Sequence, residues 1–136
     1  MSLEACLGRQ YKLEKSENFE EFLKAFGVGY LIRKMAQVVN PYIELKRDGD
    51  TYTLTSSSSF KHRELKFRLG EEFEEERHDG TLVKAVITLQ DESTLFHRQM
   101  ADDGKSATVT RHFTPEQVTI TMRLNDVICK KIYKAV

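Results

Sequence analysis

Lys131 and Tyr133 lie two residues apart and form the pair in this sequence best placed to do chemistry. Side chains alternate across a strand, so in a strand over 127–133 both would share one face with Val127 and Cys129. A face that carries valine, cysteine and tyrosine is expected to point inward. A buried cation on that face is costly unless an anion meets it. The pair therefore indicates either an internal ion pair or a site for an acidic ligand.

Arg111 is a second cation that strand alternation predicts to point inward. It shares one face of the segment 106–112 with the apolar Val109. Alternation also places Ser56 and Ser58 on an inward face. A dry core would not tolerate this set of polar groups, whereas a water-containing ligand cavity would.

The elements that must position these residues begin with two short helices. Apolar residues recur at helical spacing in the segments 19–26 and 31–39. Polar residues at 16–18 are suited to cap the first helix, Gly27 and Gly29 separate the two, and Pro41 stops the second. Each helix is predicted to be about nine residues long.

The chain after Pro41 is predicted to consist of strands and turns. Turn signals such as Asp48-Gly49, Asp79-Gly80 and Asp103-Gly104 punctuate runs of strand-forming residues. About ten strands are expected, at 11–13, 42–46, 51–55, 64–69, 72–77, 82–89, 94–100, 106–112, 118–124 and 127–133. Two helices cannot cover a whole sheet, so we expect a closed or nearly closed barrel with a helical lid and an internal cavity.

Composition narrows the class of protein. The 136 residues favour one domain over 1–136, and 21 basic residues balance 21 acidic ones, which argues against a nucleic-acid partner. No signal peptide or membrane-spanning run is evident. Cys6 and Cys129 have no metal-ligand spacing, so reduced thiols in a cytosolic protein are expected rather than a disulfide.

No catalytic or metal-binding constellation is found in the sequence. His62, His78, His97 and His112 lie at no metal-ligand spacing and are each expected on the surface or in a turn. The acidic run 71–76 is predicted to be a solvated edge strand. We expect no enzyme activity, no cofactor and no metal.

Several segments resemble, in order, the intracellular lipid-binding proteins, the family of cytosolic fatty-acid-binding and cellular retinoid-binding proteins. They are Gly8-Arg9-Gln10-Tyr11-Lys12-Leu13, Ser16-Glu17-Asn18-Phe19, Gly27-Val28-Gly29, Ser59-Phe60-Lys61, Leu69-Gly70-Glu71-Glu72-Phe73, Asp103-Gly104-Lys105-Ser106 and Val127-Ile128-Cys129-Lys130-Lys131-Ile132-Tyr133. The resemblance covers essentially the whole chain. It looks closest to the fatty-acid-binding members, those of invertebrates among them.

The resemblance implies an all-β fold, a ten-stranded antiparallel up-and-down β-barrel (clam) with a two-helix lid between strands 1 and 2. It also implies that two cations and a tyrosine bind the ligand carboxylate, here Arg111, Lys131 and Tyr133. The common pattern has arginine where this chain has Lys131. Lysine is a compact charge rather than a planar fork, so we expect a less rigid contact with room for a bridging water. The alternative is that an internal acid holds Lys131.

The ligand tail needs an apolar wall, and each buried methylene contributes roughly 0.8 kcal/mol. The resemblance places the helical candidates and Phe60 at the portal. Phe26 and Leu31 are predicted instead to pack between the helices and the barrel. The full tail and portal set is Phe19, Phe22, Leu23, Val28, Ala36, Val39, Pro41, Ser56, Ser58, Phe60, His78, Asp79, Val109, Ile120 and Met122.

The expected function is that of a cytosolic, monomeric carrier of long-chain fatty acids. One alternative keeps the fold but binds a retinoid or another hydrophobic carboxylate. Another is a structural protein of membrane surfaces, which would need a strongly basic exterior that the balanced charge does not supply. Lys24, Arg33 and Lys34 suggest transient membrane contact through the lid and nuclear entry, as in some relatives, although solvated charges are the simpler interpretation.

Overall fold

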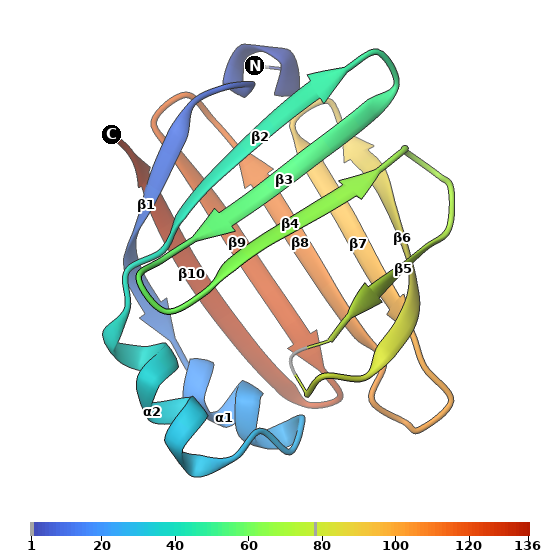
Figure 1. The fold of residues 1–136 in the computed structure, drawn as a ribbon. Helices are drawn as coiled ribbons and strands as arrows, with labels where there is room; N and C mark the ends of the chain where they lie inside the picture. The colour runs from blue at the N-terminus through green and yellow to red at the C-terminus, as the bar shows by residue number, and fades with distance from the viewer. Residues whose placement is uncertain (1, 78) are drawn as a thin grey trace.

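The computed structural model describes residues 2–77 and 79–136. Ten antiparallel strands form a nearly closed barrel, and two helices lie across one end of it (Figure 1). This confirms the predicted all-β barrel with a two-helix lid between the first two strands. A 3-10 helix, Leu3–Cys6, precedes β1 (Gln10–Glu17), α1 (Phe19–Ala25), α2 (Tyr30–Val38), β2 (Tyr42–Asp48), β3 (Thr51–Ser57), β4 (His62–Phe67), β5 (Phe73–Glu76), β6 (Leu82–Asp91), β7 (Thr94–Met100), β8 (Ala107–Phe113), β9 (Gln117–Leu124) and β10 (Val127–Ala135).

Strands that follow one another in the chain pair with each other, and β1 closes the sheet by pairing with β10. The order is β4-β3-β2-β1-β10-β9-β8-β7-β6-β5, so within the described residues β4 and β5 are the two edges, and we call the line between them the seam. A register shift between Leu13 and Lys15 bends β1. Its first part, Gln10 to Lys12, pairs with β2, while its second part pairs only with β10. The barrel therefore opens at the end where the helices lie.

The opposite end of the barrel is sealed by packing. Tyr11 and Phe113 meet edge to face with their ring centroids 6.1 Å apart, and the Tyr11 hydroxyl donates a hydrogen bond of 2.8 Å to the carbonyl of Thr114. Leu3 and Cys6 of the 3-10 helix are buried in the same core. Cys6 and Cys129 are both free thiols, as predicted.

The start of α1 differs from the prediction. Residues 16 and 17 belong to β1 because they pair with β10, so they do not cap the helix. Asn18 occupies the N-cap with a positive φ of 62°, and its side chain makes no capping hydrogen bond. Its amide donates instead to the carbonyl of Ile128, at 3.0 Å. The polar residue thus ties the helix start to the barrel rather than satisfying the helix itself.

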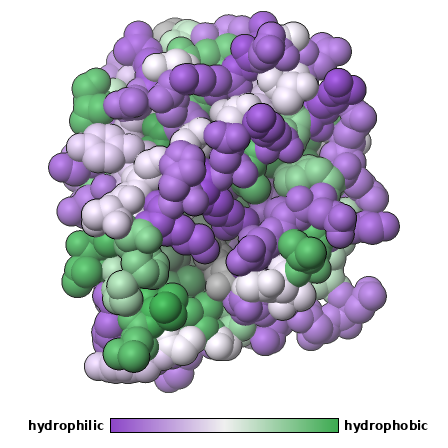
Figure 2. Space-filling model, in the orientation of Figure 1, coloured by the Kyte–Doolittle hydropathy of each residue, from purple (hydrophilic) through white to green (hydrophobic). Residues whose placement is uncertain are grey.

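The two helices differ in how much they bury. Phe26 lies against Phe22, with ring centroids 5.2 Å apart and both side chains buried, which confirms its predicted packing role. None of α2 is buried, and Leu31 is 77% exposed, so its predicted packing role is wrong. The apolar residues of α2 instead form an exposed patch, visible in Figure 2 over the helical end of the molecule. This α2 apolar face consists of Tyr30, Leu31, Ile32, Met35 and Val38.

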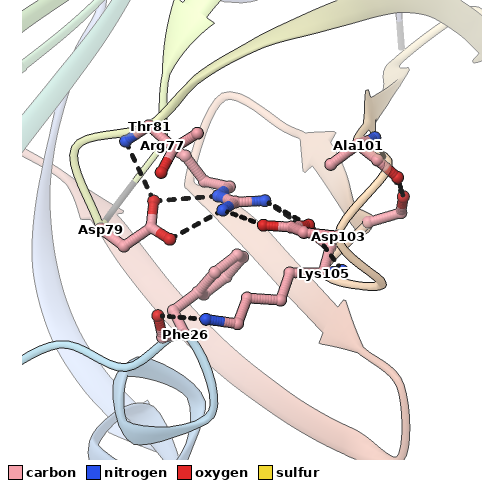
Figure 3. Close-up of polar contacts among 8 residues, drawn as sticks. Phe26, Arg77, Asp79, Thr81, Ala101, Asp103 and Lys105 are labelled. Carbon is pink, nitrogen blue, oxygen red and sulfur yellow. Dashed lines mark hydrogen bonds and ion pairs between the residues drawn. The ribbon is translucent and has the colours of Figure 1, made fainter.

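A buried arginine holds the far end of α1 to the barrel (Figure 3). The Arg77 guanidinium contacts the carboxylates of Asp79 and Asp103, each at 2.7 Å, and lies 5.4 Å from the centre of the Phe26 ring. Lys105 donates a hydrogen bond of 3.3 Å to the carbonyl of Phe26. The hydrogen bond from Arg77 lowers the pKa of Asp103 to about 2. We call this group of residues the Arg77 clasp.

Candidate functional site

An internal cavity of about 240 Å³ lies inside the barrel beneath the helices. This is many times the roughly 10–15 Å³ of such space that one water needs. Both the lid and the inward faces of the strands contribute to its wall. The lining residues are Leu13, Phe19, Leu23, Val28, Ile32, Ala36, Val39, Pro41, Ile43, Leu54, Ser56, Ser58, Phe60, Lys61, Arg63, Leu65, Glu75, His97, Gln99, Val109, Arg111, Ile120, Met122, Lys131 and Tyr133.

The structure places Arg111, Lys131 and Tyr133 on the wall of this one cavity. Most of the predicted tail and portal residues lie there too. These are Phe19, Leu23, Val28, Ala36, Val39, Pro41, Ser56, Ser58, Phe60, Val109, Ile120 and Met122.

Three predicted tail and portal residues are not part of the described wall. Phe22 is buried on α1, but it packs against Phe26 rather than facing the cavity. The carboxylate of Asp79 is held by Arg77 in the clasp. His78 lies outside the described residues.

Strand register explains why the two cations share the cavity. Arg111 of β8 pairs with Ile120 of β9, which in turn pairs with Lys131 of β10. Residues opposite one another on neighbouring strands point to the same face, so the three side chains form one inward row. The two cations therefore flank a single apolar residue.

Lys131 is a buried cation without an acidic partner. Lys131 is only 8% exposed, and no hydrogen bond or ion pair joins its side chain to another of the described residues. Its Nζ lies 3.3 Å from the centre of the Phe19 ring. Burial lowers the pKa of Lys131 to about 8. Within the described chain, no internal acid holds Lys131, which was the alternative considered from the sequence.

Arg111 is placed differently, because it belongs to a polar network. Its Nη1 donates to Nδ1 of His97 at 3.0 Å. Since arginine can only donate, His97 accepts at Nδ1 and carries its proton on Nε2, from which it donates to the carboxylate of Glu75. Glu75 also accepts from Arg63 at 2.8 Å. Burial lowers the pKa of Arg111 to about 10 and raises that of Tyr133 to about 12.

Two residues of this network contradict the sequence predictions. His97 was expected on the surface or in a turn, and it is 1% exposed. The acidic run was expected to be a solvated edge strand, and β5 is an edge strand, but Glu75 is 4% exposed and lines the cavity. Alternation from Phe73 predicts an inward Glu75. The surrounding acidic residues obscured that signal.

The network holds Glu75 as a carboxylate and His97 as a neutral imidazole. Burial raises the pKa of Glu75, but the interactions with His97, Arg63 and Gln99 together lower it by more. Burial lowers the pKa of His97, although the hydrogen bond to Glu75 opposes that shift. One acidic residue and four basic ones line the cavity, so it is cationic; these residues are Glu75, Lys61, Arg63, Arg111 and Lys131.

Sequence reasoning also missed apolar wall residues on the first strands. Ile43, Leu54 and Leu65 all line the cavity. Strand alternation predicts inward positions for them, but apolar residues on a barrel strand pack a core just as well. The resulting wall suits an elongated apolar molecule with an anionic group at one end.

Comparisons with known proteins agree with this geometry. The sequence pattern of the lipocalin / cytosolic fatty-acid binding protein family matches residues 8–136. A fatty acid-binding protein of Tyrophagus putrescentiae is 43% identical over 128 residues, covering 94% of this chain and 96% of that protein.

Solved structures agree as well. The fatty acid-binding protein from brain tissue of Drosophila melanogaster matches with a TM-score of 0.91 and 45% identity, over 96% of this chain and 99% of that one. A Schistosoma mansoni fatty acid binding protein in complex with arachidonic acid also has a TM-score of 0.91, with 30% identity over 100% and 99% of the two chains. Neither helix among the described residues has the length and apolar character needed to cross a bilayer.

Proposed function

Because the chain belongs to the lipocalin / cytosolic fatty-acid binding protein family, we propose that it reversibly binds one long-chain fatty acid inside the barrel and carries it through the cytoplasm as a monomer. The observation that carries this proposal is the pair of inward cations, Arg111 and Lys131, on an otherwise largely apolar wall. Lys131 has no acidic partner among the described residues, so a carboxylate ligand supplies the missing anion.

The head and the tail of the ligand contribute differently. The guanidinium of Arg111, the ammonium of Lys131 and the hydroxyl of Tyr133 bind the carboxylate. A water molecule bridges the carboxylate to the ammonium of Lys131. Each methylene of the tail adds roughly 0.8 kcal/mol when it is buried against the wall. The tail therefore supplies most of the affinity, while the head group fixes the orientation.

A displacement assay on delipidated protein tests this proposal. Palmitate should displace a fluorescent fatty acid at a ratio of one per protein, while hexadecanol, which has the same chain length but no carboxylate, should compete at least tenfold less well. Retinoic acid tests the alternative ligand class. Tighter binding of retinoic acid than of palmitate would shift the proposal to a retinoid carrier, and failure of every lipid to displace the probe would refute it.

We also propose that the lid contacts anionic membranes when the ligand is released. The α2 apolar face is exposed, and Arg33 and Lys34 lie beside it on the same helix. Replacing Leu31 and Val38, which are 77% and 79% exposed, by serine should slow transfer of a fluorescent fatty acid to phosphatidylserine vesicles. Leu82→Ser is the control, since Leu82 is 66% exposed but lies on β6. Equal slowing by the control would contradict the proposal; nuclear entry stays a prediction.

A further inference from the structure

We propose that Lys131 forms a reversible imine with long-chain aldehydes that enter the cavity, so that the protein captures these aldehydes as well as fatty acids. The inference rests on the proposed use of the cavity by a lipid. It adds a covalent reaction that an arginine at the same position could not perform, because guanidinium stays protonated and is a poor nucleophile.

The surroundings of Lys131 favour an unprotonated amine. The side chain is buried, it faces the cavity, and no hydrogen bond or ion pair links it to the rest of the described chain. Desolvation disfavours the ammonium, and no carboxylate of residues 2–77 or 79–136 forms an ion pair with it to offset that cost. With a pKa of about 8, roughly a tenth of the amine is unprotonated at pH 7, which is more than a hundredfold above an ordinary lysine.

The close contact with Phe19 acts in the opposite direction. An aromatic ring centred 3.3 Å from Nζ stabilises the ammonium through its π face. Burial is the largest influence on the pKa of Lys131 and lowers it to about 8, against a smaller opposing effect of Cys129. Phe19 belongs to the lid and lines the same cavity, so it also provides apolar surface beside the amine for a ligand chain.

The reaction balances without an oxidant or a reductant. The amine nitrogen attacks the carbonyl carbon, a C–N bond forms, and the carbonyl oxygen takes up a proton from nitrogen to give a carbinolamine. The hydroxyl then leaves with the second amine proton as water, and a C=N bond remains. An aldehyde carries its carbonyl carbon at the end of the chain, where a fatty acid carries its carboxyl carbon. The same cavity therefore presents either group to Lys131.

Reductive trapping tests the inference. Delipidated protein is incubated with hexadecanal and sodium cyanoborohydride, which reduces an imine in preference to the free aldehyde, and the intact mass and a peptide map are recorded. We expect one secondary-amine adduct per protein, located at Lys131 and suppressed by excess palmitate. Lys131→Arg should reduce the adduct at least tenfold. Lys130→Arg, which changes the exposed neighbour on the other face of β10, should leave it unchanged.

The peptide map of the wild-type protein decides the question even if a variant folds poorly. An adduct spread over exposed lysines, or one of equal yield in folded Lys131→Arg, would overturn the inference. Palmitate binding to the wild type is measured in parallel by calorimetry. If palmitate binds and no adduct forms at Lys131, this inference alone fails; if neither lipid binds, the proposed function fails with it.

Discussion

Arg111 and Lys131 line one cavity, yet only Arg111 is linked to an acidic residue of the described chain. Arg111 reaches the carboxylate of Glu75 through the ring of His97, whereas Lys131 has no acidic partner among the described residues. A bound carboxylate thus meets one oriented guanidinium and one ammonium that lacks an anion.

Removing the Arg111 charge should weaken fatty-acid binding strongly. Loss of one partner in a buried charged hydrogen bond costs about 3 kcal/mol, so Arg111→Gln should raise the Kd for palmitate roughly a hundredfold. Arg123→Gln removes an arginine from the exposed face of β9 and should leave the Kd unchanged. The measurement is displacement of a fluorescent fatty acid. An unchanged Kd in Arg111→Gln would move the carboxylate site elsewhere.

Acidification should destabilise the fold through His97. Burial lowers the pKa of His97 in the folded state, where the ring lies between the charges of Glu75, Arg63 and Arg111. Below pH 6.5 the histidine of the unfolded chain therefore takes up a proton that the folded protein resists, and the folded state loses stability. The pKa of Glu75 is lowered too, which adds to the loss at lower pH. The urea concentration at the unfolding midpoint should therefore decrease as the pH is lowered from 7.5 to 5.5.

Two variants assign this pH dependence to its source. His97→Gln keeps an amide that can donate to Glu75 but cannot titrate, so the difference between the two midpoints should shrink. His62→Gln changes an exposed histidine and should retain the wild-type difference. An equal difference in His97→Gln and in the wild type would rule out His97 as the titrating group.

At the scale of elements, the Arg77 clasp joins three segments that the sequence does not connect. Asp79 follows β5, Asp103 and Lys105 lie between β7 and β8, and Phe26 follows α1. The clasp therefore fixes one end of α1 to the barrel while α2 buries no side chain. Opening of the lid should begin at α2 and be limited by the clasp.

Weakening the clasp should accelerate release of the ligand. Asp103→Asn removes one carboxylate from the buried Arg77 guanidinium, so the end of α1 is held less firmly and the dissociation rate of a fluorescent fatty acid should rise severalfold. Stopped-flow transfer to vesicles measures this rate. Asp102→Asn changes the exposed neighbour and should leave the rate as in the wild type. Equal rates in all three proteins would show that the clasp does not control release.

The sequence predicted the strands and turns well because turn residues act locally. The Asp48-Gly49 pair, for example, marks where β2 ends and the turn to β3 begins, without help from the rest of the fold. Alternation likewise predicted which face of β8 and β10 points inward. Periodicity could not predict the orientation of α2. It shows that a helix has an apolar face, but not whether that face packs against the barrel or stays exposed. The Glu75–His97 pair was missed because the two residues are distant in sequence.

At the scale of the whole molecule, a neutral chain encloses a cationic interior. Four basic residues and one acidic residue line the cavity, while the chain as a whole carries 21 of each. The rest of the chain therefore carries three more acidic residues than basic ones. The electrostatic attraction to an anionic lipid is therefore stronger inside the cavity than at the surface, whereas a neutral lipid of the same length feels no such difference.

The seam between β4 and β5 has a consequence for association between copies of the chain. Two unpaired edges are places where other molecules can add strands and polymerise. Here the guanidinium of Arg63 on β4 donates to the backbone carbonyl of Glu76 and to the carboxylate of Glu75, so it links the two edge strands across the seam. We therefore expect the side chain that completes the polar network also to protect the barrel from aggregation.

Arg63→Met should expose that edge. Light scattering at 37 °C should then rise faster than for the wild type, at protein concentrations where both begin as monomers. Arg68→Met, which alters an exposed arginine just beyond β4, should behave as the wild type does. Equal stability of all three against aggregation would mean that the seam is protected by its short β5 strand alone.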